Sequence, residues 1–128
     1  MKTKYMVALA IVGSFALGAA AVHGLHAQAR PIAYVVAQVN VTDKDAYAKE
    51  FLPIAVKAIE DAGGKFIARG GKTASFMGAQ PDNRIVLFHF ENMDKAQAWW
   101  DSPGRKNSQP VGDKYATFRI FAVEGVSP

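Results

Sequence analysis

GGKFIARGG, at residues 63–71, decides how the chain divides into helices and strands. A phosphate-binding glycine loop leads from a strand into the start of a helix, where free N–H groups face the anion. Here Gly63-Gly64 follows a helical pattern and precedes a strand, so this pair predicts the end of a helix. The second pair, Gly70-Gly71, predicts a bulge or bend in a strand that covers Lys65–Arg69 and resumes at Thr73–Met77. The stretch is therefore interpreted as a strand between bends, and a nucleotide loop is not expected.

The rest of the chain alternates between strand and helix patterns. β-Rich segments with alternating side chains predict strands, and apolar residues at helical spacing predict helices. Proline within a helix removes one backbone hydrogen bond and bends or interrupts it. The elements expected around 65–69 are a strand at 31–41, a helix from Thr42 or Asp43 to Ala62 that kinks or splits at Pro53, a strand at 84–90, a short helix from Asn92 or Asp94 to Trp100, a polar segment to Asp113, and a strand at 115–123.

This order of elements predicts the fold class. Strand, helix, strand, strand, helix, strand makes two split βαβ units, which is the pattern of a ferredoxin-like α+β sandwich with an antiparallel four-stranded sheet. Both helices then cover one face of the sheet. The strands are too apolar for the second face to remain exposed, which predicts a homodimer whose sheets pack face to face as a dimeric α+β barrel.

The first 29 residues differ in kind from the rest. Lys2 and Lys4 precede an apolar run from Met6 to Val22, and Ala27-Gln28-Ala29 offers a cleavage site, which predicts a signal peptide at 1–29 and a single domain at 30–128. An uncleaved inner-membrane anchor is the alternative. The protein is therefore expected to be exported, either periplasmic or secreted, with membrane contact only if the leader is not cleaved.

Composition excludes several classes of function. The chain has no cysteine, which excludes disulfides, thiolate metal sites and a cysteine nucleophile. Without Lys2 and Lys4 there are 13 basic and 11 acidic side chains, a net charge of +2, and the basic residues are scattered. No nucleic-acid partner is therefore expected. Only one histidine lies beyond residue 29, so no metal site and no cofactor are predicted.

Several segments carry a family resemblance. In this order, YVVAQVNVTDKDAYAKEF, GGKFIARGG, RIVLFHFENMDKAQAWWDSP and FAVEGV resemble the family catalogued as domain of unknown function (DUF) 1330. The resemblance covers about Ala33 to Val126. It implies ferredoxin-like subunits that pair into a dimeric α+β barrel, and it implies no particular reaction. Members usually continue after Ser-Pro with Glu and an aromatic residue, where this chain has 104–107, Gly-Arg-Lys-Asn.

The strongest candidate ligand-binding residue is Arg69 with its neighbours Gly70 and Gly71. An arginine beside glycines can present its planar fork to a carboxylate while backbone N–H groups lie nearby. The family pattern supports this role for Arg69. The alternative is a structural salt bridge to an acid such as Glu124 or Asp43.

Five other residues are candidates for a site. His89, in an apolar strand, would act as a general base or lone haem ligand, or else pack in the core. Of Trp99 and Trp100, one ring is expected to pack on the sheet and the other to line a pocket mouth or the dimer interface. Tyr34 and Asn40 would line a cavity if their strand faces turn inward, since a one-residue change of register reverses every face.

The function expected from these residues is binding of a small organic molecule in a cleft between sheet and helices or within the dimer. Three alternatives stay open. The first is a cofactor-independent enzyme for proton transfer or hydrolysis on a small carbonyl compound, with His89 as acid or base and Arg69 as anion clamp. The others are a structural or interaction dimer without a ligand, and a haem-binding barrel.

Overall fold

Four antiparallel strands form one sheet in the order β2-β3-β1-β4. In the computed structural model, which describes residues 30–127, the strands are β1 (Ala33–Val41), β2 (Lys65–Arg69), β3 (Arg84–Phe90) and β4 (Ala116–Glu124). The sheet and its helices belong to the unit Pro31–Val126, and the predicted signal peptide lies outside the described residues. This strand order confirms the predicted ferredoxin-like α+β fold.

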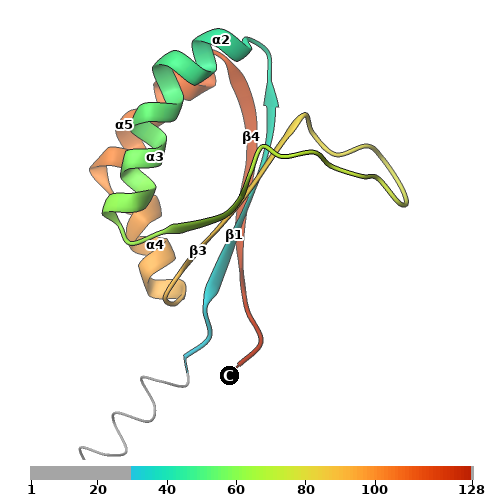
Figure 1. The fold of residues 1–128 in the computed structure, drawn as a ribbon. Coiled ribbons are helices and arrows are strands. Elements are labelled where there is room, and N and C mark those ends of the chain that lie inside the picture. Colours follow the sequence, from blue (N-terminus) through green and yellow to red (C-terminus); the bar gives the residue numbers. More distant parts are fainter. Residues whose placement is uncertain (1–29, 128) are drawn as a thin grey trace, which may run out of the picture. The chain divides into compact units, whose positions relative to one another are not determined.

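The helices all lie on one face of the sheet, as Figure 1 shows. They are α2 (Lys44–Ala46), the π-helical turn η1 (Tyr47–Phe51), α3 (Leu52–Asp61), α4 (Met93–Asp101) and α5 (Pro103–Asp113). We call the helix-covered side of the sheet the inner face and the other side the open face. Among the described residues, no helix has the length and apolar character needed to cross a membrane.

The helical stretch between β1 and β2 passes Pro53 without a break. Asp43 caps its start, because the side chain accepts a hydrogen bond from Ala46 N at 3.2 Å. The turn η1 follows, and in it Leu52 N–H bonds to the Tyr47 carbonyl five residues back. Pro53 then takes an early position of α3, where its missing N–H costs little. The irregularity predicted at Pro53 is therefore a π turn just before it.

The first glycine pair ends α3 as predicted. Gly63 has φ +90°, and its N–H bonds to the Glu60 carbonyl at 3.0 Å, while Gly64 N–H bonds to the Ile59 carbonyl at 2.9 Å. These two bonds are a Schellman motif, which favours glycine because an ordinary residue is strained at positive φ. A Cβ on Gly64 would also lie 2.6 Å from Ile59 Cγ2, so both glycines are needed to turn the chain into β2.

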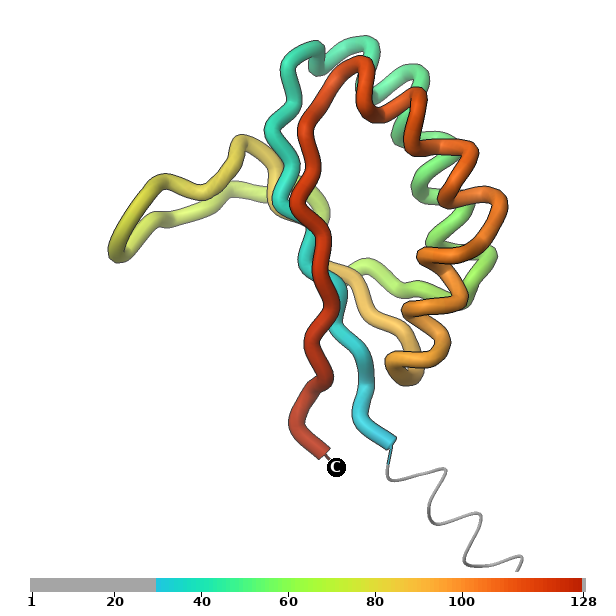
Figure 2. The backbone as a smooth tube through the Cα atoms, turned by 180° about the vertical axis from the view of Figure 1, so that it is seen from behind, coloured from blue at the N-terminus to red at the C-terminus, as the bar shows by residue number. Residues whose placement is uncertain are grey.

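The prediction that the strand resumes at Thr73–Met77 is wrong. Residues 71–83, which we call the arm, contain no strand and are exposed throughout. Asn83 closes the arm on β1, where its Oδ1 accepts from Val41 N at 2.9 Å and its Nδ2 donates to the Val41 carbonyl at 3.0 Å. In Figures 1 and 2 the arm extends away from the helices, on the side of the open face.

The polar segment predicted up to Asp113 is also wrong, because most of it is helix α5. The Ser102 side chain caps this helix by accepting from Arg105 N at 3.3 Å. Two glycines let α5 pack closely. A Cβ on Gly104 would lie 3.2 Å from the Ala58 side chain of α3, and one on Gly112 would lie 2.6 Å from the Phe51 ring. Packing against neighbours thus stabilises a helix that its own composition disfavours.

The core lies between the inner face and the helices. Alternate residues of β1 from Ala33 to Val41 are buried, as are Val86, Phe88 and Phe90 of β3. Trp99 joins this cluster from α4, with its ring 5.2 Å from that of Phe88. On β1 and β3, the residues that lie between these buried ones point to the open face. That split between faces follows directly from the two-residue period of a strand.

Candidate functional site

A cavity of about 380 Å³ lies between the inner face and the helices. Its walls are mostly apolar and aromatic side chains, among them Phe51, Phe66, Phe88, Trp99 and Phe118. Three arginines also line it, namely Arg69, Arg84 and Arg105. A largely apolar cavity with a few polar groups is the usual form of a small-molecule site.

A β-bulge in β2 places Arg69 at this cavity. Phe66 pairs with Phe88 and Arg69 pairs with Val86, and the register shifts between Phe66 and Ala68. In a regular strand, residues three apart point to opposite faces. The extra residue, Ile67, therefore brings Arg69 to the inner face together with Phe66, and the Arg69 guanidinium lies 4.6 Å from the Phe66 ring centroid. A bulge or bend was predicted at Gly70-Gly71: Gly70 is a bend, and the bulge lies three residues before it, at Ile67.

Arg84 enters the cavity from the first position of β3. It shares the inner face with Val86 and Phe88, and its guanidinium lies 5.7 Å from the Tyr47 ring centroid. Gly70 packs directly against it, since a Cβ there would lie 2.3 Å from Arg84 Nη1, and Gly70 also has φ +68°. Gly70 therefore contributes by leaving room for Arg84. Gly71 has nothing within 4 Å of its Cβ position and lies in the exposed arm.

Arg84 contains a buried donor with no acceptor. Its Nε is buried and has no hydrogen-bond partner in the described part of the chain. Burial raises the pKa of the Tyr47 hydroxyl, and the nearby Arg84 guanidinium offsets this shift only in part. Tyr47 is therefore neutral at physiological pH and supplies no negative charge to Arg84.

The third arginine is held at the tryptophan pair. Arg105 donates from Nε to the Trp100 carbonyl at 2.6 Å and from Nη1 to Gln109 Oε1 at 2.6 Å. Its guanidinium stacks 3.7 Å from the Trp100 ring centroid. Trp99 is only 5% exposed, and its Nε1 is buried without a partner in residues 30–127. Trp99 thus packs on the sheet while Trp100 is partly exposed beside Arg105.

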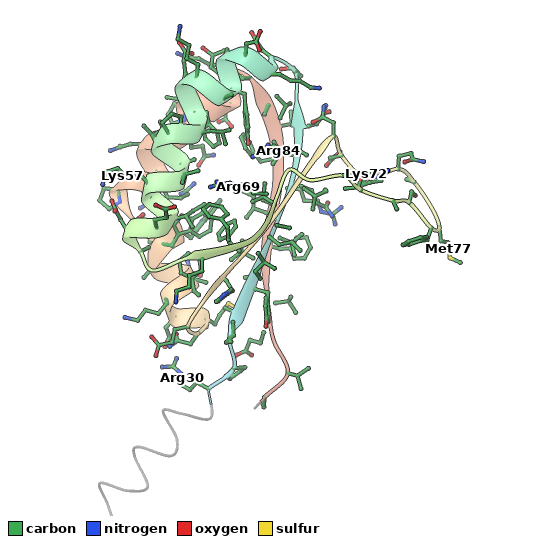
Figure 3. The ribbon with its side chains drawn as sticks, in the orientation of Figure 1. Arg30, Lys57, Arg69, Lys72, Met77 and Arg84 are labelled. Carbon is green, nitrogen blue, oxygen red and sulfur yellow. The ribbon has the colours of Figure 1, made fainter. Side chains whose placement is uncertain are left out.

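The charges of the cavity are not balanced by the chain. Within residues 30–127 the three arginines form no ion pair with a carboxylate, which leaves the predicted salt bridge of Arg69 to Glu124 or Asp43 unformed. Asp113 also lines the cavity and is exposed, as Arg69 is, so the lining carries three positive charges and one negative charge. Figure 3 shows Arg69 and Arg84 on the helix side of the sheet, with Lys72 and Met77 on the arm. The cavity is therefore a positively charged, mainly apolar site.

The other sequence candidates lie on the open face. His89 pairs with Tyr34 across β3 and β1, and their ring centroids are 6.1 Å apart. Asn40 accepts a hydrogen bond from Asn83 Nδ2 at 3.1 Å. The structure therefore brings Arg69, Trp99 and Trp100 to one cavity and separates them from His89, Tyr34 and Asn40. Because His89 and Arg69 point to opposite faces, they do not form one catalytic site within a subunit.

Arg84, Arg105 and Tyr47 also line the cavity, and the sequence analysis did not identify them. The alternation of β3 contained the signal for Arg84, because Arg84, Val86 and Phe88 are two residues apart and share a face. Arg105 lies in the helix that was not predicted, and Tyr47 belongs to the π turn. Neither residue has a sequence motif that marks it.

Comparison with known proteins places the chain in a family without assigning an activity. The model of the "Domain of unknown function (DUF1330)" matches residues 32–126. No match is found among curated proteins. A solved structure of a protein of unknown function from Rhodopseudomonas palustris, RPA0582, is similar, with a TM-score of 0.62, 12% identity and coverage of 77% of this chain and 85% of that one.

A second solved structure has the same kind of fold. It is a conserved protein of unknown function from Bacteroides thetaiotaomicron, described as a possible oxidoreductase, with a TM-score of 0.50 and 12% identity. The alignment covers 76% of this chain and 100% of that one. At this identity, both likenesses support the fold alone.

Proposed function

The chain belongs to the DUF1330 family, and we propose that it binds a small organic molecule in the cavity between the inner face and the helices. The observation that carries this proposal is a cavity of about 380 Å³ that receives arginines from β2, β3 and α5. Its volume lies within the range of small-molecule sites, and its apolar walls with a few polar groups match their usual chemistry.

Filling the cavity should abolish binding of a neutral apolar dye. Ala55 of α3 lines the cavity and is partly buried, so Ala55→Phe places a ring in the space that the ligand would use. We expect wild-type protein to bind N-phenyl-1-naphthylamine with a rise in dye fluorescence, and Ala55→Phe to weaken binding by about tenfold or more. The measurement is a fluorescence titration, with circular dichroism to confirm folding.

The matched control for this titration is Ala48→Phe. Ala48 is exposed and does not line the cavity, so this variant adds the same ring elsewhere and should bind the dye as wild type does. Equal binding by all three proteins would show that the dye sits outside the cavity. No binding to wild type would contradict the proposed function.

We also propose that two copies pair through their open faces. A row of side chains crosses the open face from β2 to β4, because Ala68 pairs with Leu87, Leu87 with Val36, and Val36 with Phe121. In the described part of the chain no helix covers this row (Figure 1). The arm extends on the same side (Figure 2) and carries the exposed Phe76 and Met77, of which Met77 lies near the tip in Figure 3, which suits contact with a second copy. A two-fold axis would bury the same apolar surface on both copies.

Export is proposed from the sequence of residues 1–29. Two lysines, an apolar run and an A-x-A site support cleavage before Arg30. Chain recovered from the cell envelope is therefore expected to have the mass of Arg30–Pro128, measured by intact-protein mass spectrometry. A full-length mass in the membrane fraction would indicate an anchor, and recovery from the cytoplasm alone would contradict export.

A further inference from the structure

We propose that the ligand of this cavity is a small organic acid, whose carboxylate is held jointly by Arg69 and Arg84 and whose apolar, planar body lies against the aromatic wall. This inference rests on the proposed function, because it names the chemical class of the ligand. It assigns Arg84 the role of second clamp residue.

Sheet register brings the two arginines together. Arg69 pairs with Val86, and Arg84 lies two residues before Val86 on the same strand and the same face. Arg69 and Arg84 are therefore diagonal neighbours on adjacent strands, and long side chains at diagonal positions reach a common point. The bulge at Ile67 is what makes this possible, because a regular β2 would turn Arg69 to the open face.

Neither arginine has an anion to balance it. Arg69 contacts the Phe66 ring and Arg84 contacts the ring and hydroxyl of Tyr47, which is neutral. No carboxylate in residues 30–127 forms an ion pair with either arginine. The two like charges on adjacent strands, with Arg84 half-buried and Arg69 exposed, repel each other. An anion between them removes the repulsion and accepts from their forks.

Unsatisfied donors point to the same conclusion. The Nε of Arg84 is buried and has no acceptor among the described residues. The same holds for the Nε1 of Trp99, a side chain that is only 5% exposed and lines the same cavity. Buried donors nearly always have a partner in native proteins. A carboxylate bound beside Arg84 supplies an acceptor to Nε, because a guanidinium pairs with a carboxylate through two parallel N–H groups.

Arg105 differs from the other two and does not form part of the clamp. Its Nε and Nη1 already donate within α4 and α5, and its guanidinium stacks on Trp100. The clamp therefore offers one anion site, in a cavity whose aromatic wall includes Phe66, Phe88 and Trp99. A single acidic group with an apolar body matches this arrangement, whereas inorganic phosphate would leave the aromatic wall uncovered.

A matched pair of ligands tests the carboxylate. We would titrate the protein by isothermal calorimetry at low salt with 2-naphthoate and with its neutral counterpart 2-naphthamide. Wild type is expected to bind naphthoate about 10- to 100-fold more tightly. Arg69→Gln and Arg84→Gln should each lose most of this preference while binding naphthamide as wild type does. Arg84→Lys keeps the positive charge but lacks the planar guanidinium, so its preference for naphthoate should lie between those of wild type and Arg84→Gln.

The control variant is Lys49→Gln, which removes an exposed positive charge from η1 outside the cavity and should leave both affinities unchanged. Equal binding of naphthoate and naphthamide by wild type would overturn the inference and leave the proposed function standing. If wild type binds neither naphthoate nor naphthamide but still binds the neutral dye, the inference is overturned and the proposed function stands. If wild type also fails to bind the dye, both the inference and the proposed function are overturned. If inorganic phosphate at equal concentration displaces naphthoate, the ligand is phosphate and the inference of an organic acid is wrong.

Discussion

Phe88→Ala is expected to lower the free energy of unfolding by about 3 to 5 kcal/mol. Phe88 is only 2% exposed and packs against three other rings, those of Phe66, Phe90 and Trp99. Removing its ring costs the transfer of that surface from water and also leaves a space that the sheet cannot close, because Phe88 lies on one of the two central strands. Small domains have about 5 to 15 kcal/mol of stability, so this one substitution removes a large share.

The same substitution at Phe76 is the control. Phe76 lies in the arm and is 95% exposed, so Phe76→Ala should change the unfolding free energy by less than about 0.5 kcal/mol. Urea denaturation of the two variants and wild type, followed by circular dichroism, measures both effects. A loss at Phe88 no larger than the loss at Phe76 would mean that the inner-face core is not packed as described.

The regular parts of the fold could be predicted from the sequence because they follow from simple periods. Strand β3 was predicted at its observed bounds, Arg84–Phe90, since every second side chain there is large and apolar. The end of α3 at Gly63-Gly64 was predicted because a helix often ends with glycine in the left-handed conformation. With four strands and two helical regions in order, few topologies remain.

Helix α5 was missed because its stability comes from distant residues. Gly104, Pro110 and Gly112 all lower helix propensity, and local sequence is therefore a poor guide here. What favours the helix is its fit: Gly112 leaves room for the rings of Phe51 and Phe118, which come from η1 and β4. Contacts of this kind appear only once the whole fold is known.

The candidate site was predicted in part for a related reason. Arg69 was selected from its residue type, its glycines and the family pattern, and it lies at the cavity. Its pairing with Arg84 on one face depends on the bulge at Ile67, which shifts the register of β2 by one residue and has no mark in the sequence. The same uncertainty of register led to His89, Tyr34 and Asn40 being grouped with Arg69, although they point to the open face.

If two copies pair through their open faces, one charged substitution on that face should dissociate the dimer. Phe121 lies on β4 and is 45% exposed in the single chain, so Phe121→Glu should leave the subunit folded. In a two-fold dimer the substitution places two carboxylates in the apolar interface and removes two rings from it. We expect the dissociation constant of the dimer to rise by about a hundredfold or more, measured by sedimentation velocity over a range of concentrations.

Ile54→Glu separates this effect from a general effect of charge. Ile54 lies on α3, is 40% exposed and does not line the cavity, so the variant replaces a similarly exposed apolar side chain on the helix side of the molecule. It should remain as dimeric as wild type. If Phe121→Glu and Ile54→Glu dimerise equally well, the copies pair through another surface, and if wild type is monomeric at all concentrations, the open face is not covered by a second copy. Dissociation by Phe121→Glu alone would mean that the row from Ala68 to Phe121 is apolar because another subunit covers it.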